Sequence, residues 1–404
     1  MKKLLFSLFF ILFINLKADV KKDLNIKCNN CDWSTWSGQK CSPQKIFYPN
    51  NLEEIKEIIA DAYNNNIPVR FYGTGHSINN LVCTNGYLVN TDNFNKILAI
   101  DKKNQTVRVE GGMKLKHFFK ELAKEGLALK NQGFIKEQSI AGALATGTHG
   151  TGKTGTLSDF IISIEIIDGL GRYQVISNNE NAQWLQAARI HLGAFGFVYA
   201  VTLKCVPLFV LKHKRKMHKW AEVLKNFDSY YENNDYFMLM AHPVSDNVLV
   251  YTWNKTEEPP TNNFFIRLSE RLLMNEVSNY LTIKAAHWAP GITNEFISLF
   301  FKAMEQKEHR EYSYKTLSPI KNPHKVENYI EEEIAIPVIY FKDAISDVFT
   351  LYNEYKKRDF ELVGFLTCRF VKSSNKALLS PTYNQDCVYI SLITLSCFKE
   401  YKNF

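Results

Sequence analysis

The sequence predicts an α+β protein of two domains. The chain has 404 residues, of which 46% are hydrophobic and 22% charged, and this composition is typical of a globular protein with room for two or three domains. In the first half, short strand patterns alternate with amphipathic helix patterns. Beyond about residue 210 the chain becomes poor in glycine and rich in aromatic residues, which places the domain boundary near Val210.

Residues 1–18 have the pattern of a secretory signal peptide. Two lysines precede an apolar run at 4–16, and Ala18 is a candidate cleavage point. The run is shorter than the about 20 residues that span a membrane. Leu16 is large for its position before the cut, so an uncleaved N-terminal anchor stays open as the alternative. We expect an exported protein, periplasmic or secreted.

Export changes the interpretation of the cysteines near the mature N-terminus. Cys28, Cys31 and Cys41 lie close together, and an oxidising compartment favours a local disulfide among them. Zinc is the alternative, but it needs four ligands and no second Cys or His pair follows at finger spacing. The other cysteines stand singly in apolar surroundings and are expected in the core: Cys83, Cys205, Cys368, Cys387 and Cys397.

The first clear element is a helix that starts at Asn51. Asn is a favoured N-cap residue, and Glu54 stands at the third helical position, as in a capping box. Apolar residues follow at helical spacing: Leu52, Ile55, Ile59 and Ala62. A short strand at 69–72 then leads into Gly73-Thr74-Gly75-His76-Ser77.

The alternation continues through the first half. Residues 87–90 and 106–109 are predicted strands, and a helix with Leu115 and Leu122 on one face ends at Gly126. The strand at 199–206 closes this half. The first domain is therefore a mixed α+β unit of short strands.

Three glycine-rich stretches, at 73–77, 139–155 and 191–198, indicate backbone that approaches a ligand closely. Gly-x-Gly after a strand also begins the nicotinamide-dinucleotide fingerprint, but Ile78 replaces the third glycine. A glycine turn without a ligand is the second alternative. Two separate loops, each with a histidine, favour a large cofactor held from both sides.

These stretches carry a resemblance to a known family. The segments are Arg70-Phe71-Tyr72-Gly73-Thr74-Gly75-His76-Ser77, Val107 to Gly112, Gln138 to Gly152 and His191 to Gly196, with Leu378-Leu379-Ser380-Pro381-Thr382-Tyr383 and Asp386 farther on. They resemble the sugar-1,4-lactone oxidases, L-gulonolactone and D-arabinono-1,4-lactone oxidase among them, of the vanillyl-alcohol-oxidase flavoproteins. The resemblance implies a two-part FAD-binding domain over 43–210 and an α+β substrate (cap) domain over 211–404.

The resemblance also implies site residues. The cofactor-binding set would be Tyr72, Gly73, Thr74, Gly75, His76, Ser77, Gly133, Ser139, Gly142, Gly147, Thr148, His149, Gly150 and Val198. His76 would be bonded to the flavin 8α-methyl group, since a neutral imidazole is a nucleophile; a histidine that only hydrogen-bonds FAD is the alternative. Gly133 stands where, in this family, a small residue is associated with oxygen reaching the flavin; a turn glycine is the alternative. His149 is expected to be structural.

Two departures from the family concern catalysis. The family's Glu-x-Arg pair reads Thr367-Cys368-Arg369 here, so Arg369 stays and the carboxylate is lost. Glu331 to Glu333 are near in sequence, but a run of charges is expected on a solvated helix face. The family closes with a His-Trp-x-Lys segment some tens of residues beyond the stretch Leu378 to Tyr383, whereas this sequence ends at Phe404, 404 − 386 = 18 residues past Asp386. His287-Trp288 cannot replace that segment, because it precedes Ala289-Pro290.

The resulting prediction is an FAD-dependent oxidoreductase with Arg369 and Thr367 at its catalytic site. It would oxidise a CH–OH group of a sugar lactone or polyol by hydride transfer to flavin N5, with oxygen or an electron carrier as the final acceptor. The alternative is a truncated, non-catalytic flavin-binding remnant. No metal site is expected.

The basic run Lys212–Lys219 is the best argument for a nucleic-acid partner. The net charge of +8 is a mild excess, and no nucleic-acid-binding motif accompanies the run. We expect an exposed edge strand whose charged side chains prevent pairing with other strands, and we expect no nucleic-acid partner.

Overall fold

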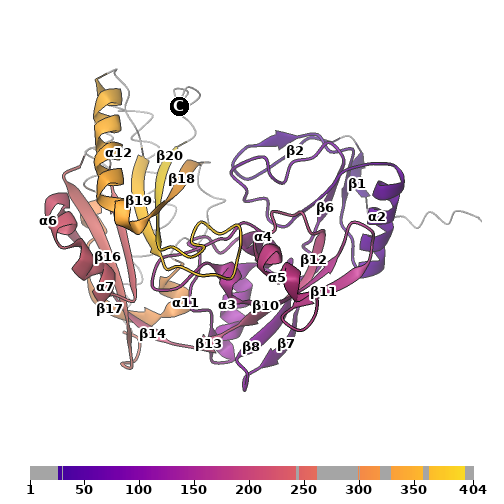
Figure 1. The fold of residues 1–404 in the computed structure, drawn as a ribbon, viewed down its shortest axis with the longest axis horizontal. Helices are drawn as coiled ribbons and strands as arrows, with labels where there is room; N and C mark the ends of the chain where they lie inside the picture. The colour runs from indigo at the N-terminus through magenta and orange to yellow at the C-terminus, as the bar shows by residue number, and fades with distance from the viewer. Residues whose placement is uncertain are drawn as a thin grey trace, which may run out of the picture.

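The computed structural model describes residues 26–29, 31–242, 245–261, 299, 301–318, 329–357 and 364–395. It consists of an N-terminal half, up to Pro207, and a C-terminal half from Val210 (Figure 1). The predicted signal segment, His287-Trp288 and Cys397 lie outside the described residues. Within the described part of the chain, no helix combines the length and the apolarity that crossing a membrane requires.

The first sheet of the N-terminal half carries the predicted strand-helix-strand unit. Strands β4, β6 and β5 are parallel, and β1 pairs antiparallel with β4. The bounds are β1 (Ile26–Asn29), β4 (Lys45–Phe47), α2 (Leu52–Asn64), β5 (Val69–Tyr72) and β6 (Tyr87–Asn90). The predicted cap of α2 is confirmed: Glu54 N donates to Asn51 Oδ1 at 3.0 Å, and Asn51 Nδ2 donates back to Glu54 Oε1 at 2.8 Å.

The second sheet is antiparallel, in the order β11-β10-β12-β8-β7. Its bounds are β7 (Ile97–Asp101), β8 (Thr106–Glu110), β10 (Ile161–Ile167), β11 (Tyr173–Ser177) and β12 (Phe197–Lys204). The helices of this half are α3 (Leu115–Lys124), α4 (Ile140–Ala145), the 3-10 helix η1 (Leu157–Phe160) and α5 (Ala182–Arg189). Phe118 and Leu122 of α3 are fully buried against this sheet, and Gly126, with φ +74°, ends the segment as predicted.

Short strand pairs complete the N-terminal half. They are β2 (Trp33–Ser34) with β3 (Lys40–Cys41), and β9 (Leu127–Ala128) with β13 (Val206–Pro207). The cysteines follow the prediction in part: Cys31 is in a disulfide, whereas Cys41 is a free thiol. Cys205, Cys368 and Cys387 are buried, as expected, but Cys83 is only half-buried.

The C-terminal half is built on a seven-stranded sheet in the order β17-β14-β16-β15-β19-β20-β18. The strands are β14 (Val210–Lys219), β15 (Tyr236–Ala241), β16 (Asn247–Thr256), β17 (Gln306–Tyr312), β18 (Tyr329–Pro337), β19 (Gly364–Val371) and β20 (Cys387–Leu395). The helices are α6 (Trp220–Lys225), α7 (Phe227–Asn233), α11 (Ser313–Thr316), the 3-10 helix η4 (Val338–Tyr340) and α12 (Phe341–Lys356).

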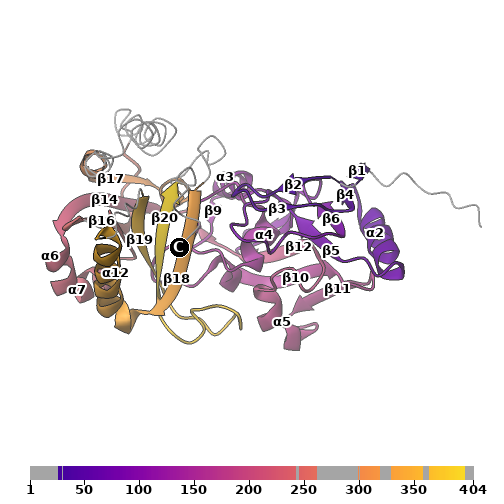
Figure 2. The same cartoon turned by 90° about the horizontal axis from the view of Figure 1, so that it is seen from above.

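The two faces of this sheet have different environments. Helices α6, α7 and α12 cover one face, where Leu366, Cys368 and Phe370 of β19 pack into the core (Figures 1 and 2). Because side chains alternate along a strand, Phe365, Thr367 and Arg369 of β19 belong to the opposite face. That face is turned toward the N-terminal half (Figure 2).

Two predictions about charged runs are wrong. The run Lys212–Lys219 lies in β14, which pairs with β17 on one side and β16 on the other, so it is no sheet edge. Its alternate residues His213 and Arg215 are buried, while Lys214 and Lys216 are exposed. Glu331 to Glu333 lie in strand β18 and not on a helix. In both segments, successive side chains point to opposite faces, as in any strand, and a count of charges does not detect this alternation.

The two halves are joined by hydrogen bonds as well as by the chain. Gly152 N donates to Phe370 O at 2.6 Å, and Ser374 Oγ donates to Asp159 Oδ1 at 2.7 Å. Arg189 Nη1 donates to Lys376 O at 2.9 Å. The loop that follows β19 therefore lies on the N-terminal half, next to the ends of α4 and α5 (Figure 1).

Candidate active site

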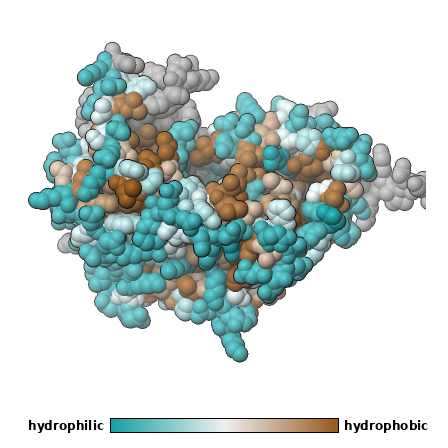
Figure 3. Space-filling model, viewed as in Figure 1, coloured by the Kyte–Doolittle hydropathy of each residue, from teal (hydrophilic) through white to brown (hydrophobic). Residues whose placement is uncertain are grey.

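A cavity of about 670 Å³ lies between the two halves. One wall comes from the glycine-rich stretches of the N-terminal half, and the other from the face of the seven-stranded sheet that carries Thr367 and Arg369. Figure 3 shows a depression between the two lobes with apolar residues along its border. Its size is within the range of small-molecule and cofactor sites, about 300–1,000 Å³.

The first wall needs glycine where two of its loops touch. A Cβ on Gly73 would lie 2.1 Å from Ser139 Oγ, so a side chain there would push the loop after β5 away from α4. Gly75 and Gly147 have φ of +70° and +66°, a conformation that residues with a side chain rarely adopt. Contact between loops and backbone conformation therefore require glycine at this wall, and close approach to a ligand stays a prediction.

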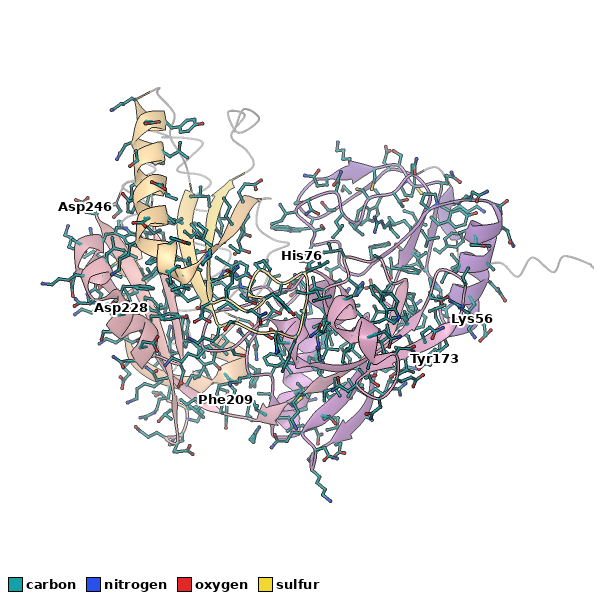
Figure 4. All side chains as sticks on the ribbon, viewed as in Figure 1. Lys56, His76, Tyr173, Phe209, Asp228 and Asp246 are labelled. Atoms are coloured by element: carbon teal, nitrogen blue, oxygen red, sulfur yellow. The ribbon has the colours of Figure 1, made fainter. Side chains whose placement is uncertain are left out.

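His76 lies on the loop of the N-terminal half that faces the sheet (Figure 4). Its ring is 5.2 Å from the ring of Trp36, centroid to centroid. Next to it, Thr74 Oγ1 accepts a hydrogen bond from Lys114 Nζ at 3.0 Å. These contacts fix the loop on which the covalent bond to flavin is predicted.

The structure brings most of the predicted site residues to this cavity. Its border includes Tyr72, Gly73, Thr74, Gly75, His76, Ser77, Ser139, Gly142, Gly147, Thr148, His149, Val198, Thr367 and Arg369. Gly133 and Gly150 stand behind the wall. A Cβ would lie 2.6 Å from Thr148 Cγ2 at Gly133 and 2.1 Å from Gln132 O at Gly150, so both positions need glycine for packing.

The opposite wall carries a row of polar residues across three strands. Thr367, Ser391 and Glu333 are aligned in register, so they share one face. Ser391 Oγ donates to Glu333 Oε1 at 2.7 Å. Arg369, two residues along β19 from Thr367, forms an ion pair with Glu333, and its Nη2 lies 3.7 Å from Glu331 Oε1.

His149 joins this cluster from the other half. Its Nδ1 lies 2.9 Å from Gly150 O, and its Nε2 lies 3.2 Å from Glu333 Oε2. Both partners are hydrogen-bond acceptors, so His149 links a backbone carbonyl of its own half to a carboxylate of the sheet. Tyr389 packs on the ring of His149, with centroids 3.6 Å apart.

The two glutamates of the cluster have opposite pKa shifts. Burial acts to raise the pKa of Glu333, but the charges of Arg369 and His149 and the hydrogen bonds from His149 and Ser391 outweigh it and hold the pKa below its ordinary value. Burial raises the pKa of Glu331, and the charge of Arg369 only partly opposes this. The cluster therefore pairs an ionised carboxylate with one that takes up a proton more easily.

Comparison with known proteins gives the family. Residues 43–177 match the FAD binding domain family, and residues 201–404 match the D-arabinono-1,4-lactone oxidase family. The chain belongs to the D-arabinono-1,4-lactone oxidase family. Within that family, it is an FAD-dependent oxidoreductase, and the predicted FAD cofactor is confirmed.

Individual relatives agree with this family. The L-gulono-1,4-lactone dehydrogenase of Mycobacterium tuberculosis (strain CDC 1551 / Oshkosh) is 31% identical over 364 residues, 89% of this chain and 82% of that protein. The L-gulonolactone oxidase of Bos taurus is 29% identical over 370 residues, 90% and 80% of the two chains. The structure of cholesterol oxidase from B. sterolicum superposes with a TM-score of 0.75 over 92% of this chain and 81% of that one, at 16% identity. The last likeness confirms the predicted two-domain α+β fold.

The residues of this family member fit FAD. Thr91 Oγ1 is buried beside the cavity and has no hydrogen-bond partner within the described part of the chain, so it offers a polar contact to a ligand. The loops around Gly73 and Gly147 expose backbone at the same wall. These features meet the need of a dinucleotide for close backbone and polar contacts. Among the described residues, no group of three or more His, Cys, Asp or Glu side chains is placed to hold a metal.

The sequence placed Glu331 to Glu333 near the missing glutamate but favoured a solvated helix face for them, and it gave His191 no role. A strand pattern was the available signal for the glutamates, since Glu331 and Glu333 are two residues apart and Pro337 ends the run. His191 borders the cavity and its Nδ1 accepts from Gly193 N at 3.0 Å. No sequence signal distinguished it from the other histidines.

Proposed function

We propose that the protein oxidises the CH–OH group of a sugar 1,4-lactone. The observation that carries the proposal is the single cavity, which joins the FAD-binding loops to the sheet face of Thr367 and Arg369. The printed activities of the relatives support the substrate class. Reoxidation would use oxygen or an electron carrier.

The residues of the first wall would hold the cofactor. The loop from Tyr72 to Ser77 would bind FAD through backbone N–H groups, and His76 would carry the covalent bond to it. The segment from Ser139 to Gly147 would line the other side of the cofactor, because several of its N–H groups already donate to backbone carbonyls. When bound, FAD supplies the acceptor for the substrate hydride.

Arg369 would bind the substrate oxygen and stabilise the negative charge that grows on it. Contacts that position the guanidinium include the ion pair with Glu333, Ser391 Oγ at 3.4 Å and the ring of Phe134, whose centroid is 5.4 Å from the guanidinium carbon. A donor that is positioned in advance loses little free energy by reorganising during the reaction. Thr367 would add a hydroxyl next to it.

A non-catalytic flavin-binding remnant is the alternative that Thr367 suggests. The match to the oxidase family over 201–404 argues against it. The ion-paired Arg369 and two glutamates at the cavity also supply the acid-base groups that a remnant would not need.

We further propose that the protein is exported, as residues 1–18 predict. The disulfide at Cys31 supports this proposal, because disulfides persist in oxidising compartments. Thiol labelling of fractionated cells would test it. Recovery of the protein in the cytosol with the Cys31 thiol free would contradict it.

The proposed function is tested by spectroscopy of the purified protein. It should be yellow, and acid precipitation should leave flavin on the wild-type polypeptide but not on His76→Ala. Anaerobic mixing with L-gulono-1,4-lactone or D-arabinono-1,4-lactone should bleach the flavin, and Arg369→Ala should slow the bleaching by about 100-fold or more. A flavin-loaded protein that neither lactone reduces would contradict the proposed substrate class.

A further inference from the structure

The sheet of the C-terminal half offers carboxylates close to the position where the family's glutamate is missing. Thr367 is in register with Ser391, and Ser391 with Glu333. The neighbouring row runs from Phe365 through Ile393 to Glu331. Directly paired residues of antiparallel strands share a face, and Glu331 and Glu333 both border the cavity. A carboxylate lost from β19 is therefore available from β18.

Glu333 is fully engaged in holding other groups. One of its oxygens accepts from Arg369 and from Ser391 Oγ, and the other faces His149 Nε2 at 3.2 Å. A carboxylate that receives three hydrogen bonds, one of them from the Arg369 guanidinium, is strongly stabilised in its ionised form. Glu333 is therefore a positioning residue for Arg369 and His149 and a poor acceptor for a proton.

Glu331 is held more loosely. Its Oε1 lies 3.7 Å from Arg369 Nη2, and its side chain is 15% exposed. The charged groups that act on it are Arg369 on β19, Glu333 on its own strand and His149 from the N-terminal half. Burial raises its pKa above the ordinary value, and an acid-base group works best when its pKa lies nearer the working pH.

We propose that Glu331 accepts the proton of the substrate hydroxyl, in place of the glutamate that this chain lacks at Thr367. This inference rests on the proposed function. The substrate O–H bond breaks and its proton passes to the Glu331 carboxylate, while the C–H hydrogen leaves with its electron pair for FAD. The oxygen electron pair forms the C=O bond, and Arg369 binds the oxygen throughout.

The variant that tests the role is Glu331→Gln, which keeps the shape and removes the basic oxygen. Its matched control is Glu332→Gln, because Glu332 is the exposed neighbour on the other face of β18. Flavin content is measured first. In rapid anaerobic mixing with L-gulono-1,4-lactone, Glu331→Gln should reduce its flavin about 100-fold more slowly than wild type, and Glu332→Gln at the wild-type rate.

The pH profile separates a proton acceptor from a structural residue. The wild-type reduction rate should rise with pH as Glu331 loses its proton, and this rise should vanish in Glu331→Gln. A second variant distinguishes the loss of the carboxylate from misfolding. Adding Thr367→Glu to Glu331→Gln restores a carboxylate on the same sheet face and should recover at least about 10-fold of the lost rate.

A readout without substrate is infrared spectroscopy of the resting protein. The spectrum is recorded at a pH just above the ordinary pKa range of glutamate, where exposed carboxyl groups are already ionised. At that pH, the infrared band of a protonated carboxyl group should be present in wild type and in Glu332→Gln. The band should be absent in Glu331→Gln. If the band is unchanged in Glu331→Gln, or if that variant reduces flavin at the wild-type rate, the inference is overturned.

The proposed function fails in a different way. If wild type binds flavin and neither lactone reduces it, the proposed substrate class is wrong, and the infrared comparison still decides whether Glu331 is the group with the raised pKa. If the lactones reduce wild type and both glutamine variants equally fast, the proposed function stands and Glu331 is not the proton acceptor.

Discussion

His149 and His191 border the same cavity but have different hydrogen-bond partners. His149 faces two acceptors, Gly150 O and Glu333 Oε2, whereas His191 Nδ1 accepts from Gly193 N and burial lowers the pKa of His191 to about 4. Neither arrangement follows from the sequence, since both histidines stand in similar glycine-rich stretches. Their partners come from Gly150, Gly193 and Glu333, and the last of these is on another sheet.

The neutral state of His191 predicts a pH dependence of stability. The unfolded chain binds a proton below about 6.5, and the folded chain binds it only below about 4. The unfolded state therefore holds more protons between these values, and stability falls as the pH falls through this window, by about 3 kcal/mol in total. His191→Gln keeps an acceptor for Gly193 N and should remove this loss.

The measurement is the melting temperature over a pH series for wild type, His191→Gln and the control His117→Gln, whose side chain is exposed on α3. Wild type and His117→Gln should lose stability together as the pH falls, while His191→Gln loses less. Parallel curves for all three would show that another group causes the acid sensitivity.

The contact between the loop after β5 and helix α4 predicts the effect of a single methyl group. Gly73→Ala would place its Cβ 2.1 Å from Ser139 Oγ, and overpacking of this kind costs about 1–3 kcal/mol. The loop must move, so the variant should retain less flavin and melt at a lower temperature. Gly169→Ala is the control, because nothing lies within 4 Å of its Cβ. Equal flavin content in the two variants would contradict this account of the loop.

Local elements were predictable because their signals are local. The Asn51 cap, the stripe of α2 and the stop at Gly126 all act within a few residues. The sheet order β17-β14-β16-β15-β19-β20-β18 depends on pairing between distant segments, and no short window contains it. The error at Glu331 to Glu333 has this cause: a charged strand that ends a sheet and faces a cavity looks, in isolation, like a solvated helix face.

At the scale of the molecule, most of the cofactor wall was predictable and most of the charge cluster opposite was not. The resemblance gave the FAD loops because their motifs are contiguous in sequence. The cluster of Arg369, Glu331, Glu333 and His149 assembles from two strands of one half and a loop of the other. Such a site requires the relative placement of the two halves, which only the fold supplies.

Arg189 predicts how firmly that placement is held. It is 8% exposed and donates to Ile161 O at 2.9 Å within its own half and to Lys376 O at 2.9 Å in the loop after β19. Arg189→Ala leaves two carbonyl groups without this donor, at a cost of about 2–4 kcal/mol of unfolding free energy. The loop should also become easier to cleave at Lys376.

The control is Arg172→Ala, because the exposed ion pair of Arg172 with Asp168 contributes about 1 kcal/mol or less. Denaturant unfolding and limited trypsin digestion measure the two effects. If trypsin cleaves Arg189→Ala at Lys376 no faster than wild type, the other contacts of the loop, such as Ser374 with Asp159, hold the halves together without Arg189.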